Sequence, residues 1–160
     1  NLVIVPVSTD GKVSLFTSGG THLIADVAGW FTDTTAAEGS VGLFVPIIPT
    51  RVLDTRQEPT APTAATSTVT RRIGATSVVP PDSSIAIVAN ITATETSAAG
   101  YVTAWPAHTA RPLVSNLNST AAGQTIPNAA ILPLGQDDLS LYCQSGAHLI
   151  IDIAGWYTNF

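Results

Sequence analysis

Residues 148–158 read His148-Leu149-Ile150-Ile151-Asp152-Ile153-Ala154-Gly155-Trp156-Tyr157-Thr158. Residues 22–32 read His22-Leu23-Ile24-Ala25-Asp26-Val27-Ala28-Gly29-Trp30-Phe31-Thr32, so the same stretch occurs twice, 126 residues apart. Eight of the eleven positions are identical, and the other three exchange one apolar or aromatic residue for another. An internal repeat marks a structural unit that is used twice, so a proposed fold has to account for both copies.

The repeat extends towards the N-terminus of each copy. Residues 128–134 match residues 1–7 at an offset of 127, and residues 139–142 match residues 13–16 at an offset of 126. The turn between the two runs is therefore one residue shorter in the later copy, a change that loops tolerate. Each copy has three short apolar runs separated by turns, which predicts a three-stranded meander, with Asp10-Gly11 as a hairpin turn in the first. We call residues 1–32 the opening copy and residues 128–158 the closing copy.

The chain between the two copies is also typical of β-structure. Further strands are predicted at residues 43–48, 69–73, 85–92, 101–106 and 114–120. Eleven prolines and twelve glycines interrupt the sequence, and no window has the apolar spacing of an amphipathic helix. Short strands separated by turns predict an all-β fold, either an antiparallel β-sandwich or a jelly-roll-like unit.

The repeat also predicts the domain organisation. We expect residues 44–160 to form one complete β-sandwich repeat, residues 33–43 to be a linker, and residues 1–32 to be the C-terminal meander of a preceding repeat. The chain starts within the pattern, so we interpret it as a piece of a longer protein. A lone meander is only marginally stable. The opening copy should therefore pack on the complete unit, pair with another chain or contribute strands to a shared domain.

The composition excludes several classes of protein. Hydrophobic residues make up 45% of the chain and charged residues only 11%, so the chain is too apolar for disorder and its apolar runs are too short for a spanning helix. The net charge is −5, with one lysine and five arginines. A nucleic acid or an anionic membrane surface would require a basic patch. We expect neither nucleic-acid binding nor membrane insertion.

Two groups of carboxylates are candidates for a catalytic, substrate-binding or structural role. Asp54 lies between Arg51 and Arg56, and it is either a substrate-binding carboxylate or the centre of a structural ion pair. Asp26 and Asp152 occupy the same position in the two copies, inside apolar strands. Because a buried charge needs a partner, we interpret both groups as structural rather than catalytic. Asp54 would form an ion pair or cap a turn, and Asp26 and Asp152 would form ion pairs with an arginine or bond to loop amides.

The sequence predicts no catalytic residue, metal site or cofactor. His22 and His148 fall at strand starts near solvent, and the pair Asp137-Asp138 is typical of a turn. The chain has no clustered metal ligands and no Gly-x-Ser-x-Gly nucleophile elbow. Cys143 is the only cysteine, which excludes an intramolecular disulfide.

The best candidate for ligand binding is an aromatic strand face. Tyr101, Thr103 and Trp105 alternate along one strand and therefore share one face. Such a face can form a flat platform for sugar rings. The alternative is that these side chains belong to the core of the sandwich, and we expect core packing for Trp30 and Trp156.

Several motifs together carry a resemblance to a known family. They are Phe44 to Pro49, Arg51 to Arg56, Gly100 to Pro106, Ser115 to Asn118, Asn128, and Asp152 to Tyr157. In this order they resemble a module of about 115 residues that is repeated in tandem in large secreted or surface proteins of actinobacteria and related environmental bacteria. The resemblance covers residues 44–158 in full and residues 1–32 as a partial copy.

The resemblance implies an all-β accessory unit of poorly defined function, found in some proteins beside hydrolytic domains. It also implies that members often have a second cysteine directly after the Trp-Pro element. That place is Ala107 here, which leaves Cys143 unpaired.

These observations favour a non-catalytic structural module of a secreted or cell-surface tandem-repeat protein, acting as a stalk, spacer, adhesion or filament unit. Its partners would be neighbouring repeats or copies of itself, reached through β-edges or apolar faces. The alternative is a carbohydrate-binding module attached to an extracellular enzyme, with a polysaccharide as ligand. A third hypothesis is a fragment of a hydrolase.

Overall fold

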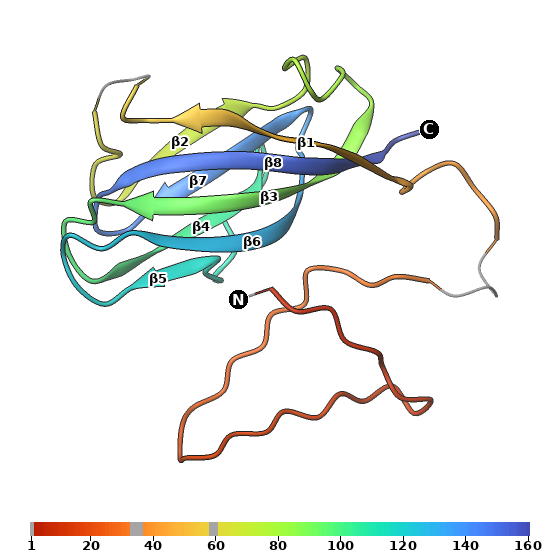
Figure 1. Ribbon diagram of the computed structural model, residues 1–160, viewed down its shortest axis with the longest axis horizontal. Helices are drawn as coiled ribbons and strands as arrows, with labels where there is room; N and C mark the ends of the chain where they lie inside the picture. The colour runs from red at the N-terminus through yellow and green to blue at the C-terminus, as the bar shows by residue number, and fades with distance from the viewer. Residues whose placement is uncertain (1, 33–36, 58–60) are drawn as a thin grey trace.

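The computed structural model describes residues 2–32, 37–57 and 61–160, and within them it contains eight β-strands in two antiparallel sheets. The strands are β1 (Phe44–Asp54), β2 (Ser67–Arg72), β3 (Ser84–Thr94), β4 (Gly100–Pro106), β5 (Leu117–Ser119), β6 (Ile126–Pro133), β7 (Asp138–Cys143) and β8 (His148–Thr158). The two sheets pack face to face, so the predicted all-β sandwich is confirmed (Figure 1). The described part of the chain has no helix that could cross a lipid bilayer.

The strand order is that of a jelly roll. One sheet has the order β1-β8-β3-β6 and the other the order β2-β7-β4-β5. The pairs β1–β8, β2–β7, β3–β6 and β4–β5 are those of one long hairpin folded over on itself. The pairs β3–β8 and β4–β7 then complete the two sheets.

The predicted meander of the closing copy is wrong, although its three strands lie where the sequence indicates. Strands β6 and β8 belong to one sheet and β7 to the other, and no two of the three are neighbours in a sheet. Each pairs only with strands from residues 44–119: β6 with β3, β7 with β2 and β4, and β8 with β1 and β3. The closing copy is thus one arm of the long hairpin, and the strands that pair with β6, β7 and β8 all lie outside it.

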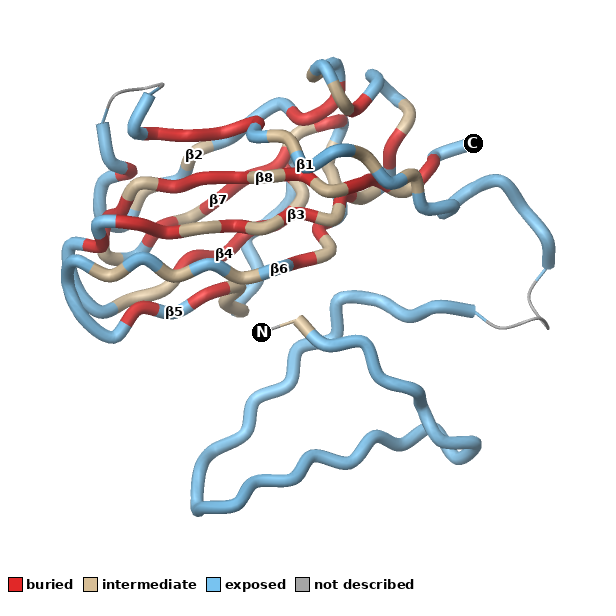
Figure 2. Tube along the Cα trace, viewed as in Figure 1, coloured by how far each residue is buried: buried red, intermediate tan, exposed pale blue. Residues whose placement is uncertain are grey.

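The core lies between the two sheets, and β3, β7 and the first half of β8 each contribute alternate side chains to it. Ile151 and Ile153 of β8, Ile87 and Ile91 of β3, and Leu141 of β7 are fully buried there (Figure 2). Complete burial of such a side chain stabilises a fold by about 1.5–3 kcal/mol relative to exposure. Every residue of this core cluster comes from residues 52–156, and the opening copy contributes none.

The opening copy has no strand in residues 2–32, so the three strands predicted there are not formed. Its Asp10-Gly11 turn is present, since Gly11 donates to the Ser8 carbonyl at 2.9 Å with a φ of +77°. Every residue from Val3 to Thr32 is exposed (Figure 2). The physical reason is that the β1 to β5 strands that would pair with this copy are already occupied by the closing copy. Of the predicted linker 33–43, residues 33–36 lie outside the described residues, and residues 37–43 contain no strand.

Candidate functional site

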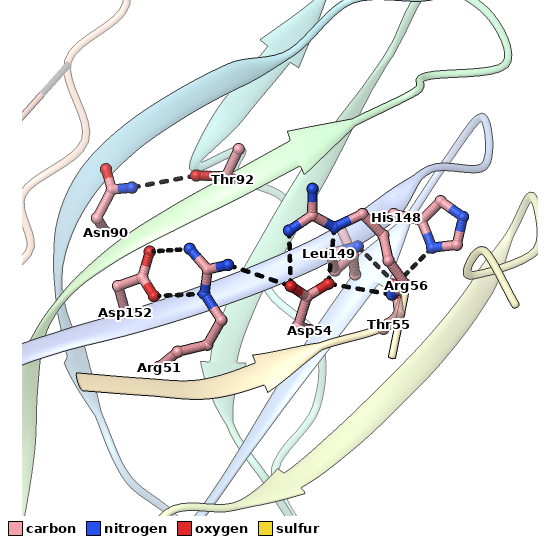
Figure 3. Close-up of polar contacts among 9 residues, drawn as sticks. All are labelled: Arg51, Asp54, Thr55, Arg56, Asn90, Thr92, His148, Leu149 and Asp152. Atoms are coloured by element: carbon pink, nitrogen blue, oxygen red, sulfur yellow. Dashed lines mark hydrogen bonds and ion pairs between the residues drawn. The ribbon is translucent and has the colours of Figure 1, made fainter. Parts of the chain in front are cut away.

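Asp54, at the end of β1, is the centre of an ion-pair network (Figure 3). Its carboxylate accepts hydrogen bonds from Arg56 Nε at 2.9 Å and Nη2 at 2.7 Å, from the Arg56 backbone N–H at 3.1 Å and from Arg51 Nη1 at 3.1 Å. The Asp54 side chain is only 4% exposed. The hydrogen bonds from Arg56 hold the pKa of Asp54 far below its usual value. Both carboxylate oxygens are therefore occupied by arginine, which leaves no free carboxylate for a substrate.

Arg51 continues the network to the last strand. Its Nε and Nη2 donate to the two carboxylate oxygens of Asp152 at 2.8 and 3.1 Å. Arg51 and Asp152 are direct neighbours in the β1–β8 register, so the backbone pairing places the two side chains together. The hydrogen bond to Asp152 raises the pKa of Arg51. The predicted pairing of Arg51, Asp54, Arg56 and Asp152 thus takes the form of one network that ties β1 to β8.

A second contact beside this network was not foreseen from the sequence. Thr55 Oγ1 lies 3.1 Å from His148 Nδ1 and accepts a hydrogen bond from the Leu149 backbone N–H at 2.9 Å (Figure 3). Thr55 is buried, while His148 is half-buried at the start of β8. A single threonine in an Arg-x-x-Asp-Thr-Arg motif carries no signal of this role, because the contact depends on a strand 93 residues away.

Asp26 and His22, the counterparts of Asp152 and His148, lack such partners. Among the described residues no arginine, lysine or histidine forms an ion pair with Asp26, and no side chain there bonds to the His22 ring. The predicted ion pair of Asp26 is therefore not formed in this part of the chain. The Asp26 ion pair is absent for the same reason as the strands of the opening copy. Arg51 of β1, which would pair with Asp26, already pairs with Asp152.

The apolar residues of the opening copy show the same contrast. Leu149, Ile153 and Trp156 are 0%, 0% and 7% exposed, whereas their counterparts Leu23, Val27 and Trp30 are 53%, 87% and 84% exposed. The core position expected for Trp30 is thus wrong, while that of Trp156 is correct. Exposed residues of this kind along one segment mark an interaction site.

The glycines of the two copies differ in the same way. A Cβ at Gly155 would lie 2.4 Å from the Phe44 ring and 2.8 Å from the Val45 carbonyl oxygen. A Cβ at Gly29 would meet nothing within 4 Å. Glycine at position 155 therefore allows β1 to lie close to β8. Within the described residues, no strand lies close to Gly29 in the same way.

The aromatic platform predicted on β4 does not exist. Thr103 is fully buried and Trp105 is 7% exposed, although neither belongs to the core between the sheets. The segment after β4 covers them: Trp105 Nε1 donates to the Thr109 carbonyl at 3.1 Å, and Thr103 Oγ1 donates to the Val114 carbonyl at 2.6 Å. Tyr101 is half-buried, with its ring centroid 5.8 Å from that of Tyr142. No flat exposed face is left for a sugar ring.

Cys143 is buried on β7, and its burial raises the pKa of the thiol. It is paired in register with Val102, whereas Pro106, directly before Ala107, is paired with Leu139. At about 3.3 Å per residue, position 107 lies about 16 Å along the sheet from Cys143. A disulfide requires Cα atoms less than about 7 Å apart. A cysteine at position 107 could not reach Cys143 in this fold.

One shallow hollow of about 400 Å³ lies beside the network, lined by Arg51, Arg71, Arg72 and residues 74–77. Two of its three arginines are already paired, Arg51 with Asp54 and Asp152, and Arg72 with Asp137. Within the described residues, no group of three or more histidine, cysteine, aspartate or glutamate side chains is placed to hold a metal ion. The exposed opening copy is therefore the candidate functional site.

Comparison of the chain with protein-family models, with curated proteins and with solved structures finds no match.

Proposed function

We propose that this chain is a non-catalytic structural module of a secreted or cell-surface repeat protein, in which it acts as a stalk, spacer or filament unit. One observation carries the proposal: the opening copy exposes the apolar side chains that the closing copy buries in the sandwich. Exposed apolar segments of this length favour association and are costly in a protein that works alone. A segment that completes a neighbouring unit explains both its sequence and its exposure.

The alternative of a carbohydrate-binding module has lost its main support. It depended on an exposed aromatic face, and Trp105 is buried under the segment that follows β4. The occupied carboxylate of Asp54 likewise gives no support to a hydrolase, which needs free acids converging on a cleft.

The test is a tandem chain in which residues 43–127 are placed directly before Asn1. In this chain the added β1 to β5 strands and the opening copy together reproduce one complete unit, because Asn1 corresponds to Asn128. We expect two folded sandwiches, so the calorimetric enthalpy of unfolding should about double relative to the 160-residue chain. Small-angle scattering should show an elongated particle.

The matched control replaces residues 2–32 of the tandem chain by a glycine-serine linker of equal length. In the control, the added residues 43–127 should remain unfolded and the enthalpy should stay near that of a single unit. Equal enthalpies for the tandem chain and its control would contradict the proposed module.

A further inference from the structure

We propose that residues 2–32 are an unpaired jelly-roll arm that docks onto a separate set of five strands of the β1 to β5 type. The first of these strands carries an arginine facing Asp26, and the turn directly after it carries a threonine facing His22. This inference rests on the proposed function, because it names the partner that a structural module would join. The five-strand set is the type of residues 44–119, and we call it the receiving set.

The strand order shows which backbone partners an arm of this kind needs. In the sandwich, each strand of the closing copy finds its hydrogen-bonding neighbours only in the receiving set. An arm of this kind cannot satisfy its own N–H and C=O groups as a sheet. The opening copy has the same pattern of residues and forms no strand by itself. Pairing with a receiving set gives each of its strands the neighbours that the closing copy has.

The polar side chains of the closing copy indicate which residues face the opening copy in its partner. Asp152 binds Arg51 through both carboxylate oxygens, and His148 contacts Thr55. The opening copy keeps both acid and imidazole, at Asp26 and His22. A carboxylate among buried apolar residues is tolerated when it is paired. The partner therefore presents an arginine on its first strand and, four residues later in the turn that follows this strand, a threonine.

The space beside the repeated glycine indicates an aromatic residue at the start of the same strand. Phe44 lies against Gly155, and its ring centroid is 5.4 Å from that of Tyr157. The opening copy keeps glycine at Gly29 and an aromatic ring at Phe31. The partner strand therefore begins with a large side chain that covers Gly29.

A second copy of these 160 residues does not serve as the partner, because the arms outnumber the receiving sets. The described part of these 160 residues contains one receiving set, within residues 44–119, and the sequence holds two arms that fit such a set. However many chains exchange arms, one arm per chain remains without strands to pair with. A self-associating chain therefore leaves the exposed apolar residues uncovered, and a different receiving set has to be supplied.

The details of the fit explain why the opening copy does not displace the closing copy. Ile151 is fully buried between Leu53 and Ile91, its register partners, and its counterpart is the smaller Ala25. Placing Ala25 there would open a void in the core. The natural partner should therefore have larger side chains opposite Ala25 than this chain has.

Residues 43–127 lack the strands that complete the sandwich, so we expect them to fold only when an arm docks. The experiment adds this fragment unlabelled, as the probe, to the isotopically labelled 160-residue chain. Amide resonances and hydrogen exchange are then followed by NMR. We expect the amides of residues 22–31 to shift and to become protected, while those of β6, β7 and β8 stay unchanged. If residues 22–31 stay unprotected at saturating probe, or if the closing copy exchanges its strands with the probe instead, the inference is overturned.

Variants of the 160-residue chain test the chemistry of docking. Ala25→Ile should bind the probe at least about tenfold more tightly, because it restores the buried isoleucine. Gly29→Val should bind at least about tenfold more weakly, because a side chain there meets the aromatic ring of the first strand. Asp26→Asn should bind about three- to tenfold more weakly through loss of the arginine pair. Ser18→Val is the matched control and should bind as the parent does, since its counterpart Gln144 is exposed.

These outcomes separate the two proposals. If the tandem chain folds into two sandwiches but the four variants bind the probe alike, the recognition chemistry is wrong and the structural module stands. If the tandem chain fails to fold its added unit, the proposed function itself is wrong.

Discussion

Arg51 on β1 and Asp152 on β8 form a two-point ion pair, with N–O distances of 2.8 and 3.1 Å, that joins the first strand of the sandwich to the last. Asp26 repeats the acid in the opening copy and has no such partner in the described residues. The same sequence thus occurs once with its partners and once without them. Substitutions at matched positions can therefore separate the effect of the structure from the effect of the residue type.

The pair Asp152→Asn and Asp26→Asn makes the first comparison. Asp152→Asn removes the charged acceptor of Arg51, so we expect the free energy of unfolding to fall by about 1 kcal/mol, since the pair is partly exposed. Asp26→Asn should change it by less than about 0.5 kcal/mol. Urea unfolding of both variants measures the difference. Equal losses would show that the opening copy is part of the folded unit.

The glycine pair makes the second comparison. Gly155→Ala places a methyl group against Phe44 and the Val45 carbonyl, so it should lower the free energy of unfolding by about 1–3 kcal/mol. Gly29→Ala has open space and should lower it by less than about 0.5 kcal/mol. Thermal unfolding by circular dichroism is a sufficient measurement. A tolerated alanine at position 155 would contradict the close contact of β8 with β1.

Acid should weaken the network through Asp54. The arginine contacts keep the pKa of Asp54 low in the folded protein, whereas an unfolded aspartate titrates near about 3.9. A depressed folded pKa means that the stabilisation is complete above the unfolded pKa and is lost as the pH falls below it. The difference in unfolding free energy between the parent chain and Asp54→Asn should be constant above about pH 5 and shrink at lower pH. A difference that does not change down to pH 2.5 would contradict this role of Asp54.

The register of β4 and β7 predicts that Ala107→Cys forms no bond with Cys143. The two positions lie about 16 Å apart along the sheet. Under oxidising conditions the variant should keep both thiols free within the monomer, as counted by mass spectrometry after alkylation in denaturant. An intramolecular disulfide in a variant that keeps its native circular dichroism spectrum would show that the register is wrong.

Within residues 44–160 the positions of the strands could be predicted from the sequence, but their pairing could not, and the three strands predicted in the opening copy are not formed. Turn residues such as Gly135 and short apolar runs such as Leu149 to Ile151 are local signals, and they locate the strands of the sandwich to within a few residues, except that β1 continues to Asp54. The consecutive strands β6, β7 and β8 look like a meander because nothing local shows that β7 crosses to the other sheet. Their actual partners lie far away in the sequence, and long-range pairing leaves no local pattern.

Some contacts of the candidate site residues could likewise be predicted from the sequence, and others could not. Arg51, Asp54 and Arg56 lie close together in the sequence, so their ion pairs could be foreseen. The burial of Trp105 could not, because strand alternation places the side chain on one face but does not tell what covers that face. Thr109 and Val114 provide the cover through backbone carbonyls, which any residue type could supply.

Hydrogen exchange of residues 3–32 tests the central claim most directly, measured in the 160-residue chain and in the tandem chain with residues 43–127 placed before Asn1. We predict that these amides exchange at the rates of an unfolded chain in the first protein and become protected like those of β6 to β8 in the second. Protection of residues 3–32 in the 160-residue chain, or their continued fast exchange in the tandem chain, would contradict the account.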